Sequence, residues 1–348
     1  MGGVRRHNAE LLPRVARLLA ASGGSLAVLE GTEMIAFALP PEIERIASDV
    51  PAGAWRRARS EPRAIRTALE RAERAGRPFD FFHTAHLPAP TGIGARYTLT
   101  IHDLRHVDSR VSSIARRAAA TLVLRRALDH AALVLAVSAS VLADLVVLHK
   151  VPEERVRLVP NAADHFTPLP RSPASDAPIL CVGHVERRKN LELVLRAMHL
   201  DRELPRLEIA GAAKRGERER LMRLAEKLGL AARVSFLGAF DDRELPRLYA
   251  RAACVVLPSR LEGFGIGALE AMRARVPLAI SHLPALMEVT GTEAPSFPVD
   301  DPAECARAVR SALSQSTAAI ERAAAIAARS SWDGSAKAWF DAWCELAR

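Results

Sequence analysis

The most informative segment of the chain is residues 254–272, CVVLPSRLEGFGIGALEAM. Its first four residues are a short apolar run typical of a buried strand, and the glycine-rich turn that follows opens a helix. Backbone N–H groups in such a turn point outward beside the positive end of the helix dipole. We therefore expect Gly263 to Gly267 to form a site for an anion or for sugar hydroxyls.

Short apolar runs alternate with helical stretches along the rest of the chain. Because buried parallel strands need helices on both faces, this alternation predicts an α/β fold of two doubly wound domains in tandem. Residues 164–178 are rich in proline and mark the boundary, so we expect domains at 1–165 and 166–330 and a final helix within 331–348. The expected strands are residues 26–29, 79–82, 97–101, 133–137 and 156–159 in the first domain, and 179–182, 207–210, 234–236, 254–257 and 278–280 in the second.

The beginning of the chain departs from this pattern. Gly2 and Gly3 open a helical stretch at residues 5–19 with no strand in front of it, although a glycine turn normally follows the first strand of such a domain. The first domain is therefore expected to lack its first, usually central, strand, or the natural start lies upstream.

The amino-acid composition limits the kinds of molecule that this protein can bind. The chain has 348 residues, 49% of them hydrophobic and 26% charged, which fits two folded domains and excludes wholesale disorder. The net charge of +9 favours anionic partners, but only 5% of residues are aromatic, so the stacking platforms of nucleic-acid binders are missing. Four scattered cysteines without CxxC spacing indicate buried thiols and a reducing cytoplasm, and we expect no membrane-spanning segment or signal peptide.

Two glutamates flank the start of the helix in the opening segment. Glu262 precedes the turn and Glu270 is expected on the first helical turn, so both carboxylates can border one pocket. Carboxylates accept strong hydrogen bonds from hydroxyl groups such as those of a ribose or a hexose. Alternatively, both glutamates only complement the positive end of the helix.

A second loop, residues 183–190 (GHVERRKN), follows the expected strand 179–182. Asn190 is a candidate N-cap of the next helix, and Lys189 stands just outside the helix start. A charged donor there joins an oriented set of N–H groups that could hold a diphosphate. The alternative is a solvated basic loop.

Histidines gather around the expected strand 97–101. His102 and Asp103 stand at its carboxyl end, where open α/β sheets place residues that face ligands. Three interpretations remain open: a metal site, hydrogen-bonded histidines at strand ends, and His102 facing a reacting centre, which we prefer. The other members of the group are His83, His86 and His106.

These motifs together resemble the retaining nucleotide-sugar glycosyltransferases of family 4. The resemblance rests on Glu262-Gly-Phe-Gly-Ile followed by Glu270, on Arg188-Lys189-Asn190 after a strand that ends in glycine, and on Thr100-Ile-His102-Asp103-Leu104. It covers nearly the whole chain in the family's order. It implies the GT-B architecture, in which two Rossmann-like doubly wound domains face each other across a cleft and the last helix crosses back onto the first domain. Further matches are residues 151–161, 236–238, 284–291 with Glu288, and 331–332.

The resemblance also implies roles for individual residues. Glu270 binds the ribose hydroxyls, Glu262 binds the donor sugar, Lys189 neutralises the diphosphate, and His102 lies near the anomeric carbon. The catalytic candidates are therefore His102, Glu262 and Lys189. Where many relatives have an arginine, this chain has His184, so Arg187 or Arg188 is expected to supply the second positive charge. The donor-binding candidates are Gly3, Gly183, Arg188, Lys189, Glu262, Gly263, Phe264, Gly265, Ile266 and Glu270.

We therefore expect a metal-independent glycosyltransferase without a cofactor, with a role in polysaccharide biosynthesis. It moves a mannose- or glucose-like hexosyl group from a nucleotide diphosphate sugar to a glycan, lipid-linked or small-molecule acceptor, with retention. Two alternatives remain: a nucleotide-sugar epimerase of the same architecture and a non-catalytic nucleotide-sugar-binding protein. We expect a cytoplasmic location with peripheral contact to the anionic inner face of the plasma membrane, and no nucleic-acid partner.

Overall fold

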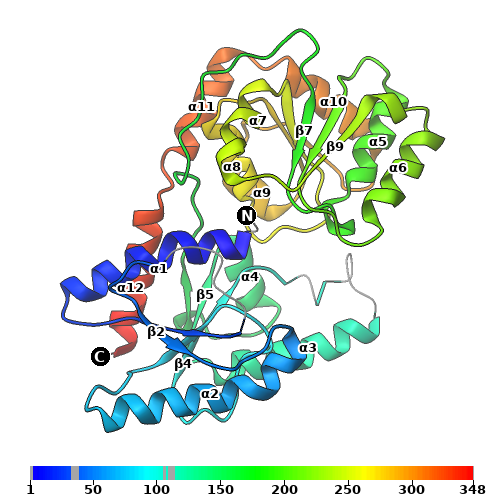
Figure 1. Cartoon of the computed structure of the whole chain (residues 1–348). Helices are drawn as coiled ribbons and strands as arrows, with labels where there is room; N and C mark the ends of the chain where they lie inside the picture. Colours follow the sequence, from blue (N-terminus) through cyan, green and yellow to red (C-terminus); the bar gives the residue numbers. More distant parts are fainter. Residues whose placement is uncertain (1–2, 33–38, 105–106, 109–113, 348) are drawn as a thin grey trace. The chain divides into compact units, whose positions relative to one another are not determined.

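The chain divides into two compact units, each of which is an α/β structure with parallel strands (Figure 1). The structure is a computed structural model that describes residues 3–32, 39–104, 107–108 and 114–347. Unit 1 comprises Met1–Gly3 and Asn161–Ser331, and unit 2 comprises Val4–Pro160 and Trp332–Arg348. Within the described ranges, no helix is both long enough and apolar enough to cross a bilayer.

Unit 1 is built on a six-stranded sheet with the order β12-β11-β10-β7-β8-β9. Its central strands are apolar because both of their faces are covered by helices. The order reverses around β7, which pairs with β8 on one side and with β10 on the other. Doubly wound sheets bind ligands at the carboxyl ends of the strands at such a reversal. The strands are β7 (Ile179–Val182), β8 (Leu207–Ala210), β9 (Val234–Gly238), β10 (Cys254–Leu257), β11 (Leu278–Ser281) and β12 (Ser296–Phe297).

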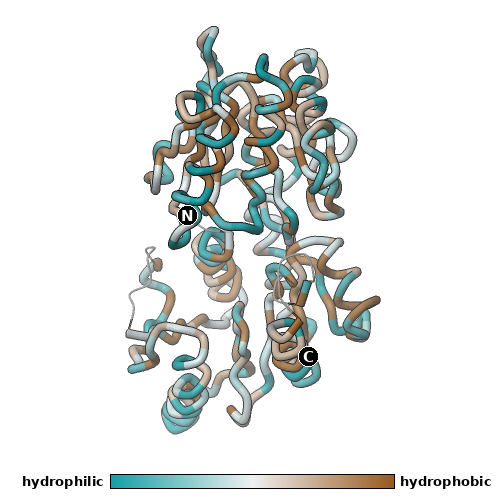
Figure 2. The backbone as a smooth tube through the Cα atoms, turned by 90° about the vertical axis from the view of Figure 1, so that its right-hand side faces the viewer, coloured by the Kyte–Doolittle hydropathy of each residue, from teal (hydrophilic) through white to brown (hydrophobic). Residues whose placement is uncertain are grey.

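Helices cover both faces of this sheet (Figure 1). One face packs alternate strand residues such as Ile179 and Cys181 against α5, α6 and α10, which together form a continuous apolar core. The other face carries α7, α8, α9 and α11. Figure 2 shows hydrophobic stretches of the backbone interspersed with hydrophilic ones. The helices are α5 (Leu191–Leu200), α6 (Glu217–Lys227), α7 (Leu245–Arg251), α8 (Ile266–Arg273), α9 (Pro284–Thr290), α10 (Pro302–Leu313) and α11 (Thr317–Ala327), with short 3-10 turns at Arg187–Lys189, Ala231–Arg233 and Asp242–Glu244.

Unit 2 contains two separate parallel sheets among its described residues. Four strands pair in the order β3-β4-β5-β6, whereas β1 and β2 pair only with each other. The strand expected at residues 79–82 begins at Phe82, and β2 was not expected at all because three of its four residues are exposed. The strands are β1 (Ala27–Glu30), β2 (Glu44–Ala47), β3 (Phe82–Thr84), β4 (Tyr97–Ile101), β5 (Leu133–Ala136) and β6 (Val156–Leu158).

The last helix, α12, belongs to unit 2 although it follows unit 1 in the sequence. Its apolar stripe buries Trp332, Trp339 and Trp343. The indole Nε1 of Trp343 donates to Thr98 Oγ1 of β4 at 3.2 Å, and the ring of Trp339 packs 4.7 Å from that of His83. The helices of unit 2 are α1 (Gly3–Ala21), α2 (Ala54–Arg74), α3 (Ile114–His130), α4 (Ala139–Val147) and α12 (Trp332–Ala347), with a 3-10 turn at Glu153–Arg155.

Candidate functional site

The loop after β7 turns sharply enough to bring Lys189 back over the end of the strand. Gly183 has φ 125°, a conformation that side chains rarely adopt, and a Cβ on it would lie 3.7 Å from Lys189 Cε. Gly211 directly follows the neighbouring strand β8, and a Cβ on it would lie 2.0 Å from the carbonyl oxygen of Gly183. Two glycines therefore let the ends of β7 and β8 approach closely enough to place the Lys189 loop.

Glu262 is the centre of the site at the ends of β7 and β10. Its Oε1 accepts hydrogen bonds from Lys189 Nζ at 2.6 Å and from Ser259 Oγ at 2.6 Å, and its Oε2 lies 3.2 Å from an Arg188 nitrogen. Burial opposes ionisation of this carboxyl, but the charges of Lys189 and Arg188 and the hydrogen bonds outweigh it and lower the pKa of Glu262 to about 2. Glu262 is therefore an anion held between two cations.

A second carboxylate orients Arg188. Its guanidinium donates to Glu186 Oε1 at 2.9 Å and to the carbonyl oxygen of Leu261 at 2.7 Å, and Lys214 forms an ion pair with the other oxygen of Glu186. The cluster thus holds three cations, Arg188, Lys189 and Lys214, against two acids, Glu186 and Glu262. The surplus positive charge suits an anionic ligand.

Arg188, rather than Arg187, lies in this cluster. Arg187 is exposed and pairs with Glu217 instead. His184 has an exposed side chain, and its partial desolvation lowers its pKa, which disfavours a positive charge on this ring. Asn190 occupies the N-cap position of α5, but its side chain does not cap the helix. Its Nδ2 instead donates to the carbonyl oxygen of Val299 at 2.8 Å.

The glycine turn at residues 263–267 forms the N-terminus of α8. Gly265 is the N-cap residue with φ 108°, and a Cβ there would lie 2.6 Å from Leu286 Cδ2. The side chain of Phe264 is buried and so holds the turn against the rest of unit 1. The first N–H groups of a helix have no partner within that helix. The backbone of the turn and of Ile266 therefore offers hydrogen-bond donors after the end of β10, a few residues along the chain from Glu262.

Glu270 has different partners from Glu262. It lies on the second turn of α8, not on the first as expected from the sequence. Its Oε2 accepts from the hydroxyl of Tyr249 at 2.8 Å, and its Oε1 lies 3.0 Å from His165 Nε2. Burial and the neighbouring carboxylate raise the pKa of Tyr249 well above its usual value, so this hydroxyl stays a donor.

Sequence reasoning missed several residues of these two clusters. Glu186 stood in the predicted loop without an assigned role, and Lys214 lies in the loop after β8. The sequence around Tyr249 indicates only an apolar face of the helix α7, and His165 lies in an irregular segment. Glu186 is two residues from its partner Arg188, whereas Lys214 is 28 residues from Glu186. Tyr249 and His165 are 21 and 105 residues from Glu270, and no local pattern reveals contacts of that range.

In unit 2, His102 follows β4 and its ring lies 4.7 Å from that of His7 on α1, edge to face. His83 is hydrogen bonded through both ring nitrogens, to Thr98 at 2.7 Å and to Thr100 at 3.2 Å, and burial lowers its pKa to about 3.

The other members of the histidine group stand apart. The Nε2 of His86 lies 3.1 Å from Glu61. His106 lies outside the described residues, as does Gly2, and Gly3 begins α1 instead of lying in a loop. Within the described residues, no three acidic, histidine or cysteine side chains are placed to share a metal ion.

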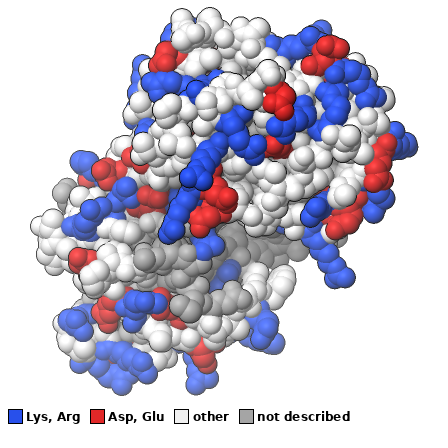
Figure 3. Space-filling view, turned by 45° about the horizontal axis from the view of Figure 1, so that its top comes forward, with Lys and Arg blue, Asp and Glu red and all other residues white. Residues whose placement is uncertain are grey.

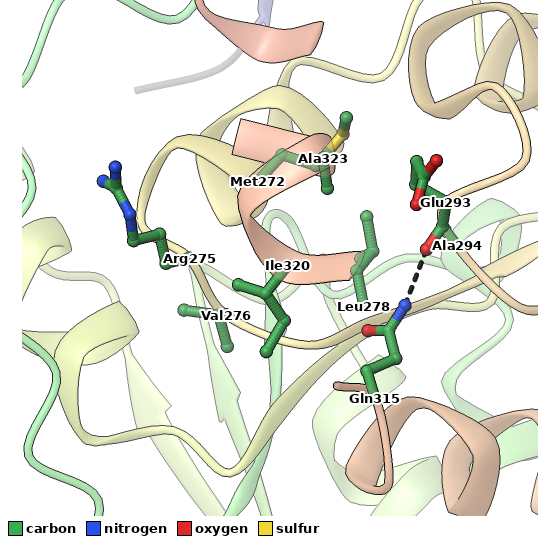
Figure 4. A pocket seen from close by; sticks show the side chains of 9 residues that line it. All are labelled: Met272, Arg275, Val276, Leu278, Glu293, Ala294, Gln315, Ile320 and Ala323. Atoms are coloured by element: carbon green, nitrogen blue, oxygen red, sulfur yellow. Dashed lines mark hydrogen bonds between the residues drawn. The ribbon is translucent and has the colours of Figure 1, made fainter. Parts of the chain in front are cut away.

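A pocket in unit 1 is too small to be the site. It lies between α8, β11 and α11, and Figure 4 shows the side chains around it, including Gln315, whose Nε2 donates to the carbonyl oxygen of Glu293 at 2.6 Å. Its volume is about 10 Å³. A space of that size holds one water molecule at most.

Two family models match this chain. The model for glycosyl transferases group 1 matches residues 170–330, and the model for Glycosyltransferase Family 4 matches residues 1–165. The chain belongs to the family 4 glycosyltransferases. The expected architecture of two Rossmann-like α/β units of the GT-B class is thereby confirmed.

Individual relatives agree with this assignment. The chain is 34% identical over 186 residues to O-antigen chain mannosyltransferase B of Escherichia coli, a match that covers 48% of each protein. Among solved structures, it is similar to a glycosyltransferase of Rickettsia africae, with a TM-score of 0.74 and 17% identity over 99% of this chain and 95% of that one. It is also similar to HepE of Anabaena in complex with UDP-glucose, with a TM-score of 0.69 and 16% identity over 94% and 92%. The matches span about half or less of the length of the curated relatives.

Proposed function

We propose that this glycosyltransferase moves a hexosyl group from a nucleotide diphosphate sugar to a glycan, lipid-linked or small-molecule acceptor, with retention and without a metal. The observation that carries the proposal is the Lys189–Glu262–Arg188 cluster at the ends of β7 and β10, beside the N-terminus of α8. Similarity to a mannosyltransferase and to a protein crystallised with UDP-glucose supports a hexosyl donor.

The chemistry of the transfer explains why such a cluster is useful. The bond between the anomeric carbon and the diphosphate oxygen breaks, and the nucleoside diphosphate leaves with the electron pair. A bond from the acceptor oxygen to the same carbon forms, and the acceptor proton passes to the leaving diphosphate. Fixed positive charge beside the departing oxygen stabilises the transition state, and we assign this role to Lys189, Arg188 and the α8 amides.

The acids and His102 complete the proposed assignment. Glu262 contacts the donor sugar and also fixes Lys189, while Glu270 accepts from the ribose hydroxyls and His102 lies near the anomeric carbon.

We place the protein in the cytoplasm, since the four cysteines are free thiols and three of them are buried, which fits a reducing compartment.

Lys189→Gln tests the proposed role of the cluster. Because a neutral amide cannot balance the charge on the leaving diphosphate, we expect kcat/KM to fall by about 100-fold or more. The measurement is release of nucleoside diphosphate from UDP-glucose and GDP-mannose with a panel of acceptors, with and without EDTA. NMR of the product gives the anomeric configuration.

The matched control is Lys227→Gln, which removes one exposed lysine at the end of α6 and should leave turnover unchanged. Equal activity of the Lys189 variant and the control would refute the assigned role, and loss of activity in EDTA would refute metal independence. An epimerised sugar in place of a new glycoside would favour the epimerase, whereas donor binding without nucleotide release would favour a non-catalytic binder.

A further inference from the structure

A large open groove in unit 2 has no role in the site described above. It lies between the β1–β2 sheet and α2 and has a volume of about 580 Å³, a size that suits a small molecule. Leu29 and Ile46 line its sheet side, and the small side chains of Ala64 and Ala68 line its helix side and leave the space open. The groove is therefore apolar at its base.

The rim of the groove is a row of cations on α2. Arg59, Arg63, Thr67 and Arg71 line it and follow one another at intervals of four residues, so they lie along one face of the helix. Adjacent members of such a row are about 6 Å apart, which lets Arg59 and Arg63 contact the same anion. Asp49 is the only acid that lines the groove, so the lining carries a surplus of positive charge.

Three other arginines of the same helix have partners of their own. Arg57 pairs with Glu61 at 3.8 Å, Arg66 donates to the carbonyl oxygen of Gly92 at 2.8 Å, and Arg74 pairs with Glu70 at 3.9 Å. By contrast, no acidic side chain in the described part of the chain forms an ion pair with the three arginines of the rim.

Basic side chains are common elsewhere on the surface as well (Figure 3). Figure 3 shows Lys and Arg side chains spread over the visible face, with acidic side chains beside many of them. The groove combines three arginines and a single acid, Asp49, with the apolar side chains of its lining.

We propose that this groove binds a ligand that carries a phosphate group, with Arg59 and Arg63 on the phosphate and the apolar base under the rest of the molecule. Guanidinium groups match the geometry of phosphate oxygens and bind them with paired hydrogen bonds. Thr67 and Ser60 add hydroxyl groups within the same groove. The proposal goes beyond the proposed function, because binding here does not depend on sugar transfer.

The test is calorimetric titration of glucose 6-phosphate, with glucose as the uncharged reference. All proteins carry Lys189→Gln, which weakens phosphate binding in unit 1. We expect Arg59→Gln with Arg63→Gln to weaken glucose 6-phosphate binding by about tenfold or more, because two charge-assisted contacts are lost. Lysine at both positions keeps the charge but not the paired geometry and should give an intermediate affinity.

The matched control is Arg56→Gln with Arg126→Gln, which removes the same charge from exposed positions that do not line the groove. Thermal unfolding confirms that all variants fold. A second arm uses phosphatidylcholine vesicles with and without phosphatidic acid: loss of vesicle binding only in the groove variant identifies a lipid headgroup as the source of the phosphate. Equal affinities in groove and control variants, or no binding to either probe, would overturn the proposal.

Discussion

Glu262 and Glu270 are both largely buried carboxylates near the start of α8, but their surroundings give them different properties. Glu262 lies between Lys189 and Arg188, which keep it ionised with a pKa of about 2. Glu270 instead meets the hydroxyl of Tyr249 and the ring of His165. The first carboxylate fixes cations for an anionic ligand, while the second is held in place by neutral or weakly basic donors.

Tyr249→Phe tests whether Glu270 must be held in position. The substitution removes the 2.8 Å hydrogen bond to Oε2 and leaves a buried carboxylate with one donor fewer. If Glu270 binds the donor ribose, as proposed, its carboxylate becomes less well oriented. We expect KM for the nucleotide sugar to rise about fivefold or more, while kcat changes by no more than about twofold.

The only other tyrosine of the chain provides a matched control. The hydroxyl of Tyr97 donates to the carbonyl oxygen of Ala127 at 2.5 Å in unit 2, also in a buried place. Tyr97→Phe should lower the melting temperature without raising KM for the donor. An unchanged KM in the Tyr249 variant, or an equal rise in both variants, would show that Tyr249 does not position a donor-binding group.

The difference between predicted and unpredicted site residues follows from the range of their contacts. Lys189, Arg188 and Glu262 stand in local strand–turn–helix patterns, and the sequence therefore predicted them. Glu186 lies in the same loop as Arg188, but its role as the carboxylate that orients Arg188 has no signal in the sequence. Tyr249 reaches Glu270 through a contact 21 residues away, which depends on how its helix packs. No periodicity or spacing in the sequence encodes that packing.

At the scale of elements, strands were predictable where both faces are buried. The expected bounds 97–101, 179–182 and 254–257 agree with β4, β7 and β10, because an apolar run of that length stays in the interior of a sheet. β2 was missed since its sequence, ERIA, is mostly exposed and pairs with one neighbour only. The two-residue strand β12 is too short to give a pattern.

Gly211→Ala tests the close approach of β7 and β8 that places the Lys189 loop. A Cβ at this position would lie 2.0 Å from the backbone oxygen of Gly183, and backbone cannot rotate away as a side chain would. We expect a loss of about 3 kcal/mol or more in the free energy of unfolding, from the clash and from the left-handed backbone. Chemical denaturation measures it.

Gly216→Ala is the control, because Gly216 also has a positive φ but a Cβ there meets nothing within 4 Å. Its cost should be about 1 kcal/mol, the strain of the backbone alone. Similar losses in the two variants would contradict the idea that the contact with Gly183 requires glycine.

At the scale of the whole molecule, the chain enters unit 1 at Asn161 and leaves it at Ser331, so that α12 returns to unit 2. The tryptophan stripe of α12 explains why this helix is stable away from its sequence neighbours. Trp339 is fully buried and contacts His7, His83 and Trp343, which come from three elements of unit 2. The last helix is therefore part of the core of unit 2.

Trp339→Ala should loosen unit 2 and leave unit 1 intact. Removing this fully buried ring costs about 3–5 kcal/mol, because the lost contacts and the cavity both destabilise the core around it. We expect faster amide hydrogen exchange in α1 and β3, whose His7 and His83 contact the ring, and in β4, which pairs with β3. Exchange in α5 and α10 of unit 1 should not change. Trp55→Ala is the control, since Trp55 on α2 of the same unit is 78% exposed. Its loss should change hydrogen exchange in neither unit. Faster exchange throughout unit 1 as well would mean that the two units do not unfold separately, and α12 would then stabilise the whole chain.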